Sequence, residues 1–119
     1  MNQFFLSLLN ALSTLEFVKK VDFQTEVFVL KGRVILKKNR FLRVYFNELT
    51  GTTAVALIEQ EKRIWGIDFV DNMRGWHLHP LDNSEGHRSI DPMDIQEIVR
   101  ALADVWSLLH KEENYPDFR

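Results

Sequence analysis

The chain has 119 residues, of which 45% are hydrophobic and 27% charged, with a formal net charge of −2 and no cysteine. Such a chain is long enough to bury one core, and the lack of cysteine excludes disulfides, thiolate metal sites and a cysteine nucleophile. The N-terminal residues lack the pattern of a signal peptide and no apolar run reaches the roughly 20 residues of a membrane span, so we expect a single domain over residues 1–119, soluble and cytoplasmic, with no membrane association.

The N-terminal segment has the spacing of an amphipathic helix. Apolar residues recur there at intervals of three and four, which places them on one helical stripe. The pattern predicts a helix over residues 2–18, with Asn2 as its N-cap. The residues of the stripe are Phe4, Phe5, Leu8, Leu9, Leu12, Leu15 and Val18.

The middle of the chain has the alternation and β-branched content of strands. Gly32 lies between the first two expected strands and indicates a bulge or bend, and Asn39 tolerates the positive φ of a tight hairpin. Because the breaks between strands are short, neighbouring strands must pair antiparallel. The five expected strands cover residues 27–30, 34–36, 41–46, 53–58 and 64–70.

The last element is a helix over residues 92–110, with Asp91 as N-cap and Pro92 at the first helical position. Its apolar stripe is continuous, so Leu102 and Trp106 should be buried. The order of elements therefore predicts an α+β fold, in which an antiparallel sheet of about five strands has the N-terminal and C-terminal helices packed on one face.

Charge is unevenly distributed. Residues 19–43 hold eight basic and two acidic side chains, whereas residues 91–119 hold seven acidic and three basic ones. A local excess of this kind indicates either a surface that binds a polyanion such as RNA or a solvated sheet face with lysines protecting an edge strand. In the first interpretation Lys37, Lys38 and Arg40 are candidate binding residues.

Three of the four histidines lie close together, at positions 77, 79 and 87. In an extended backbone His77 and His79 point to one side and Trp76 to the other, and the loop that follows is long enough to return His87 toward the pair. Three uses are open: a site for one divalent metal ion, a general acid–base pair, or a third use in which the imidazoles bind phosphate or only hold the loop by hydrogen bonds. His77, His79 and His87 are therefore candidate catalytic residues and candidate metal ligands.

The segment Gly75-Trp76-His77-Leu78-His79-Pro80-Leu81-Asp82-Asn83, followed by His87 and a closing helix, resembles the small prokaryotic TumE family. The specific match covers about residues 64–99. Members are toxin components of toxin–antitoxin pairs, so the resemblance implies an antitoxin protein as partner. Combined with the basic strands, it predicts a toxin that acts on RNA through the three histidines, with Arg74, Trp76 and Asp82 as flanking binding residues.

Two other classes remain open. The chain could be a non-catalytic interaction protein, which uses a sheet edge or the basic strands to bind a partner or to form a homodimer. It could also be a single-metal hydrolase of a small ester.

Overall fold

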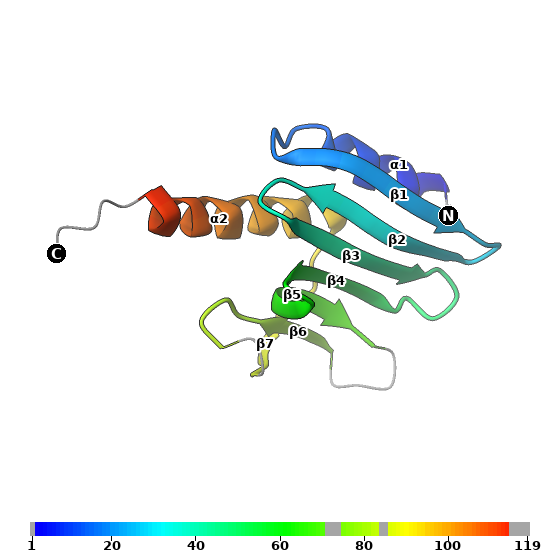
Figure 1. Ribbon diagram of the computed structural model, residues 1–119. Coiled ribbons are helices and arrows are strands. Elements are labelled where there is room, and N and C mark those ends of the chain that lie inside the picture. The colour runs from blue at the N-terminus through cyan, green and yellow to red at the C-terminus, as the bar shows by residue number, and fades with distance from the viewer. Residues whose placement is uncertain (1, 71–74, 84–85, 115–119) are drawn as a thin grey trace, which may run out of the picture.

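In the described part of the chain, seven antiparallel strands follow one another in sequence order across a single sheet, with a helix before them and a helix after them (Figure 1). The computed structural model describes residues 2–70, 75–83 and 86–114. The elements are α1 (Asn2–Leu12), β1 (Val18–Thr25), β2 (Val29–Leu36), β3 (Arg40–Asn47), β4 (Thr53–Glu59), β5 (Lys62–Phe69), β6 (Trp76–His79), β7 (Arg88–Ile90) and α2 (Ile95–Asn114).

The predicted α+β class and the antiparallel sheet are confirmed, but the strand number is wrong: the described residues form seven strands rather than about five. The first two expected strands are one strand, β2, and β1, β6 and β7 are additional. β1 escaped prediction because it is an edge strand whose mostly polar side chains are exposed and because an extra residue, Lys19, interrupts its alternation.

β2 has no bulge at Gly32, so the bulge that the sequence suggested is not present. Gly32 pairs regularly with Phe23 on one side and Val44 on the other. Its φ of +155° lies outside the range that other residues favour, and a Cβ atom here would lie 2.1 Å from the carbonyl oxygen of Asp22. Glycine is required because β1 passes so close to it.

The helix α1 ends at Leu12, six residues before the predicted end at Val18. The hydroxyl of Ser13 donates to the carbonyl of Asn10 at 2.6 Å, and that of Thr14 to Ala11 at 2.7 Å. These local bonds compete with helix continuation, so the chain turns and enters β1.

The helix α2 begins at Ile95 rather than at Pro92, and its cap is Asp94 rather than Asp91. The amide of Glu97 donates to Asp94 Oδ1 at 2.8 Å, and the amide of Asp94 donates to Glu97 Oε1 at 3.2 Å. This reciprocal capping box satisfies two amides at the helix start. The helix therefore begins after Asp94 and not after Asp91, despite the favourable Asp91-Pro92 sequence.

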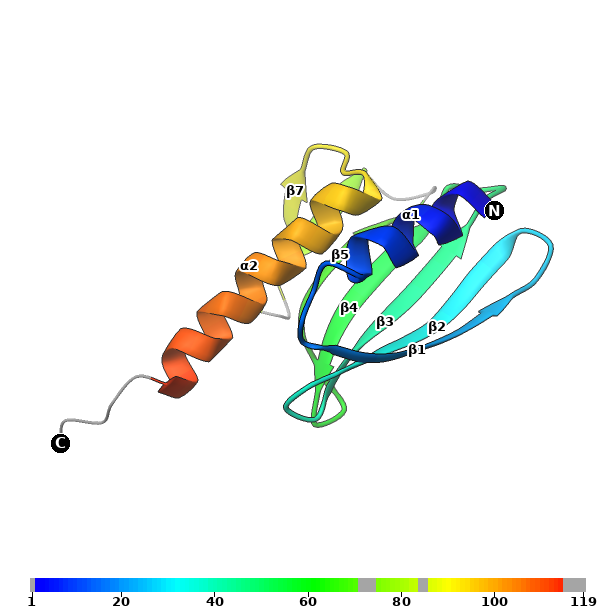
Figure 2. The same cartoon turned by 90° about the horizontal axis from the view of Figure 1, so that it is seen from above.

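Both helices lie on the same side of the sheet (Figure 2), and their side chains share one core with that sheet face. Leu102 and Trp106 are buried, as predicted. Trp106 stacks on Phe17 with ring centroids 4.3 Å apart, which packs the later turns of α2 against the start of β1. Within the described residues, neither helix has the length and apolar content needed to cross a membrane.

The opposite face of the sheet, here called the helix-free face, is not covered by either helix (Figure 2). Strand alternation turns the buried residues of β2, β3 and β4 toward the helices and the residues between them toward this face. Its central residues are Lys31, Arg33, Phe41, Arg43, Tyr45, Ala54 and Ala56.

Candidate functional site

The histidines belong to a hairpin at the end of the sheet: His77 and His79 lie on β6, and His87 lies just before β7. In β6, His77 lies opposite Asp68 of β5, and His79 lies opposite Gly66. Between them Leu78 lies opposite Ile67, a buried core residue. Both histidines therefore point to the helix-free face, and the alternation predicted from the sequence is what the structure shows.

His79 is held from two sides. Its Nε2 lies 2.9 Å from Asp68 Oδ2, and its Nδ1 lies 3.0 Å from the carbonyl oxygen of Gly86. The side chain is buried, with 8% of the residue exposed. Both partners accept hydrogen bonds, so the imidazole satisfies them together when it carries a proton on each nitrogen.

Two backbone hydrogen bonds lie near the Gly86 carbonyl. The amide of Asn83 donates to the Pro80 carbonyl at 3.2 Å, and the amide of Gly86 donates to the Asn83 carbonyl at 3.0 Å. After Gly86 the chain lies beside β6, where β7 pairs with it. The bond from His79 to Gly86 thus fixes the residue immediately before His87.

His87 completes the group. Its ring centroid lies 6.0 Å from that of His77 and 5.6 Å from that of His79. His77 Nδ1 lies 3.9 Å from Asp68 Oδ1, which is an ion-pair distance and longer than a hydrogen bond. The exposed fraction rises from buried His79 through half-buried His77 to exposed His87. The structure therefore brings the three predicted histidines to one place, with two of them open to solvent.

Asp68 is the residue of this site that the sequence reasoning missed. It faces both His77 and His79, and its side chain is 27% exposed. A signal was present: Trp65, Ile67 and Phe69 alternate on the core side of β5, which places Asp68 on the opposite face.

Metal binding by the three histidines stays a prediction. Within residues 2–70, 75–83 and 86–114, no three histidine, aspartate or glutamate side chains are arranged to hold a metal ion. Both ring nitrogens of His79 already face hydrogen-bond acceptors, so it could become a ligand only by giving up one of them.

The predicted basic residues divide between two places. Lys37 and Lys38 are exposed in the turn between β2 and β3, where Lys38 and Asn39 both have the positive φ expected of a tight hairpin. Arg40 is buried on the helix side, where its Nε bonds Glu59 and its guanidinium lies 5.1 Å from the centroid of the Trp106 ring. Arg40 is therefore part of the packing on the helix side, and of the three predicted basic residues only Lys37 and Lys38 are exposed.

Two of the predicted flanking residues, Trp76 and Asp82, lie apart from the histidine group. Trp76 faces the helix side and stacks on Phe69 with ring centroids 5.4 Å apart. Asp82 is exposed in the turn after β6, and Arg74 lies outside the described residues.

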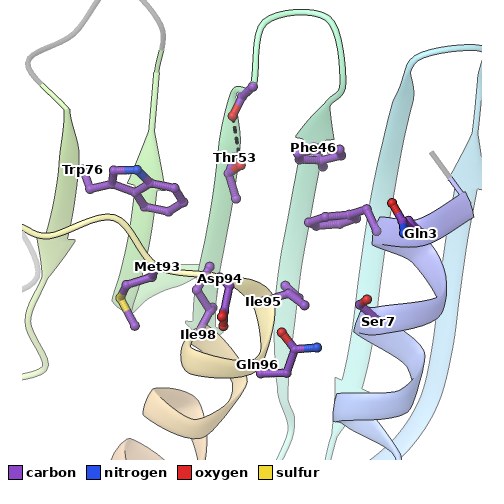
Figure 3. Close-up of a pocket in the computed structure, with 12 residues that line it drawn as sticks. Gln3, Ser7, Phe46, Thr53, Trp76, Met93, Asp94, Ile95, Gln96 and Ile98 are labelled. Atoms are coloured by element: carbon purple, nitrogen blue, oxygen red, sulfur yellow. Dashed lines mark hydrogen bonds between the residues drawn. The ribbon is translucent and has the colours of Figure 1, made fainter.

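A cleft of about 440 Å³ lies on the helix side, between α1, the start of α2 and the strands (Figure 3). Trp76 forms one wall, and the stacked rings of Phe4 and Phe46 lie across from it. Because Trp76 and His77 are consecutive strand residues, this cleft and the histidine group lie on opposite faces of the sheet.

Comparison of the chain with protein-family models, with curated proteins and with solved structures found no match.

Proposed function

We propose that the protein cleaves RNA, with His77 and His87 as the proton-transfer pair and His79 and Asp68 as the groups that position them. The observation that supports this is the convergence of three imidazoles and one carboxylate on the helix-free face, two of the imidazoles being open to solvent. Proton-transferring groups must reach the substrate, and exposed His87 and half-buried His77 meet that requirement.

The chemistry needs one base and one acid. The base takes the proton of a ribose 2′-hydroxyl, whose oxygen attacks the adjacent phosphorus atom. The acid then gives a proton to the departing 5′-oxygen, leaving a 2′,3′-cyclic phosphate on one product and a 5′-hydroxyl on the other. Imidazole suits both tasks, because it changes protonation state near neutral pH.

Each histidine has a position consistent with its role. Within the described residues, neither ring nitrogen of His87 has a hydrogen-bond partner, so both remain accessible to substrate. Asp68 lies on the Nδ1 side of His77, which directs the Nε2 edge away from the carboxylate. His79 links Asp68 to the backbone beside His87, and so keeps the two reactive rings near each other.

The test compares histidine variants on a single-stranded RNA substrate. His77→Ala and His87→Ala should each lower kcat/KM by roughly 100-fold to 10,000-fold, the usual contribution of a proton-transferring group. His110→Ala is the matched control, because His110 lies on α2 against Trp106 and should leave cleavage unchanged. Cleavage at the wild-type rate in both single variants would refute the proposal, provided that circular dichroism shows each variant folded.

A chelator separates this proposal from the single-metal hydrolase. Cleavage that is unaffected by a chelator supports proton transfer by the histidines alone. Cleavage that disappears in the chelator and returns with one added divalent ion would assign the histidines to a metal instead.

Because the chain resembles TumE-type toxins, we also propose that its RNA cleavage is toxic to the bacterial cell. Induced expression of the chain should arrest bacterial growth, and the His87→Ala variant should not. An antitoxin partner would relieve the arrest by wild type when expressed beside it. Growth that continues during expression of active wild-type protein would contradict the toxin role, though not the RNA cleavage.

A second candidate, the interaction protein, is favoured by three exposed apolar side chains in neighbouring loops. Val27 is 79% exposed, Phe28 42% and Leu49 70%. A hydrogen bond of 2.7 Å from the amide of Glu48 to the carbonyl of Phe28 joins the two loops that carry them. Apolar groups gathered in this way are typical of contact surfaces for another protein.

Sedimentation of wild type and of the double variant Val27→Asp/Leu49→Asp tests this second candidate. A homodimer of wild type that dissociates in the variant would support it. RNA cleavage should be the same in both proteins, because these loops carry none of the histidines. A monomeric wild type would exclude the homodimer.

A further inference from the structure

Two rows of cross-strand partners connect the basic strands to the histidine group on the helix-free face. The first row runs through Asp22, Arg33, Arg43, Ala56, Gly66 and His79. The second row runs through Gln24, Lys31, Tyr45, Ala54, Asp68 and His77. Directly opposed residues of antiparallel strands point to the same side, so each row begins near cations and ends at a histidine.

The two arginines of the first row form an unusual pair. Arg33 and Arg43 are exposed and lie directly opposite each other, an arrangement in which like charges repel. Within the described residues no carboxylate lies within ion-pair distance of either guanidinium, although Asp22 is the cross-strand neighbour of Arg33. A bound anion would remove this repulsion.

Aromatic rings accompany the arginines. The centroid of the Phe41 ring lies 5.5 Å from the guanidinium carbon of Arg33 and 5.9 Å from that of Arg43. Tyr45, half-buried on β3, follows Arg43 by two residues and therefore lies on the same face. Guanidinium groups bind phosphate through two hydrogen bonds at once, and aromatic side chains stack on nucleobases.

A hollow of about 450 Å³ lies beside these groups. Lys31, Arg33, Arg43 and Tyr45 line it, together with Asp22 and Gln24 toward the edge of the sheet. The three cations favour a phosphate here, and the amide of Gln24 and the carboxylate of Asp22 offer hydrogen bonds to the polar edge of a base or to a ribose hydroxyl.

Between the hollow and the histidines, the residues of β4 that face this side have small side chains. Ala54 and Ala56 are the residues of β4 that face this side, one in each row. From β3 to β6 is three strand spacings, or about 14 Å, which is about four nucleotides at roughly 3.4 Å per stacked nucleotide. A chain of that length reaches from the arginine pair to the histidines.

We propose that the helix-free face binds single-stranded RNA, with phosphate on Arg33 and Arg43, a base on Tyr45, and the strand passing over Ala54 and Ala56 to the histidines. The identity of the ligand rests on the proposed function, whereas the binding surface rests on the rows and the hollow. Single strands are preferred to duplexes, because the bases of a duplex are already stacked on each other and cannot stack on protein rings.

The experiment measures binding separately from cleavage. A fluorescent single-stranded 2′-O-methyl RNA of about ten nucleotides has no free 2′-hydroxyl and is not cleaved, so fluorescence anisotropy over a range of salt gives its affinity alone. The double variant Arg33→Gln/Arg43→Gln is compared with the matched variant Lys37→Gln/Lys38→Gln, which loses the same charge from the exposed turn between β2 and β3.

The arginine variant should bind at least about 10-fold more weakly, and its slope of log K against log salt should be shallower by about 1.4, since each phosphate contact on a single strand contributes about 0.7. Tyr45→Ala should weaken binding by roughly 5-fold to 100-fold through loss of stacking. The lysine variant should change much less. A duplex of the same sequence should bind more weakly than the single strand.

Three results would overturn the proposal: unchanged binding in the arginine variant, a larger loss in the lysine variant, or tighter binding of the duplex. The proposed cleavage fails independently, when His77→Ala and His87→Ala retain activity. If the arginine variant binds weakly but both histidine variants still cleave RNA, the protein binds RNA on this face and cleaves it elsewhere. If the arginine variant binds normally but the histidine variants lose cleavage, the proposed active site stands and the proposed binding surface is wrong.

Discussion

At the scale of single residues, the site depends on one carboxylate that serves two imidazoles. Asp68 bonds buried His79 directly and lies at ion-pair distance from His77. His79 also bonds the Gly86 carbonyl, and so it holds the backbone next to His87 close to Asp68. The positions of the two proposed proton-transferring rings therefore depend on the contacts of Asp68 and His79.

Asp68→Asn should lower kcat for RNA cleavage by at least about 10-fold while leaving KM nearly unchanged, because the amide keeps the shape but loses the charge that attracts both rings. Steady-state kinetics on the single-stranded substrate gives both constants. The exposed Asp82 provides the control, since Asp82→Asn removes a carboxylate from the adjacent turn without touching a ring. An equal fall in both variants would mean that general charge, not positioning, is responsible.

At the scale of elements, the sequence predicts those segments whose alternation is one-sided and long. β3, β4 and β5 lie within three residues of their predicted bounds, because apolar side chains mark their core face. β6 and β7 have four and three residues, too few for a pattern to stand out. The same shortness hid the hairpin of the site, although the alternation of His77 and His79 still predicted their common direction.

The sequence left the position of His87 open, because it depends on backbone contacts such as those of Gly86 with Asn83 and His79, which no local pattern encodes. Asp68 could be placed on the helix-free face from the sequence. Its contact with the histidines could not be predicted, because that contact depends on which strand pairs with β5. That strand is β6, and no local pattern encodes the pairing.

The start of α2 is an element whose cap can be tested. Asp94→Ala should lower the free energy of unfolding by about 1 kcal/mol, because the amide of Glu97 loses its acceptor. Asp91→Ala, at the position predicted from sequence, should change it by less than about 0.5 kcal/mol. Urea unfolding measures the stability of both variants. A larger loss of stability in Asp91→Ala than in Asp94→Ala would identify Asp91 as the cap.

At the scale of the whole molecule, stability and the proposed chemistry lie on opposite faces of the sheet. The helix side holds the core, including Leu102, which is 0% exposed. The helix-free face holds the arginines, the rings and the histidines. Changes on one face should therefore have little direct effect on the other.

Leu102→Ala should reduce the free energy of unfolding by about 2–5 kcal/mol, the usual cost of a buried cavity, while the rate of RNA cleavage per folded molecule stays the same. Leu108→Ala on the same helix is the control, since Leu108 is 53% exposed. Urea unfolding and cleavage assays below the transition measure the two properties. A folded Leu102→Ala protein with impaired cleavage would show that the faces are coupled.

The sequence order of the strands has a consequence for how the chain folds. Each strand pairs with the one just before it, so every ladder of the sheet closes only a short loop. The average separation of contacting residues is therefore small for a protein dominated by strands, and such chains fold quickly. The contact between α1 and α2 is different, since it joins the two ends of the described chain. The sheet can assemble hairpin by hairpin, and the covering of its core face is completed only when the last helix arrives.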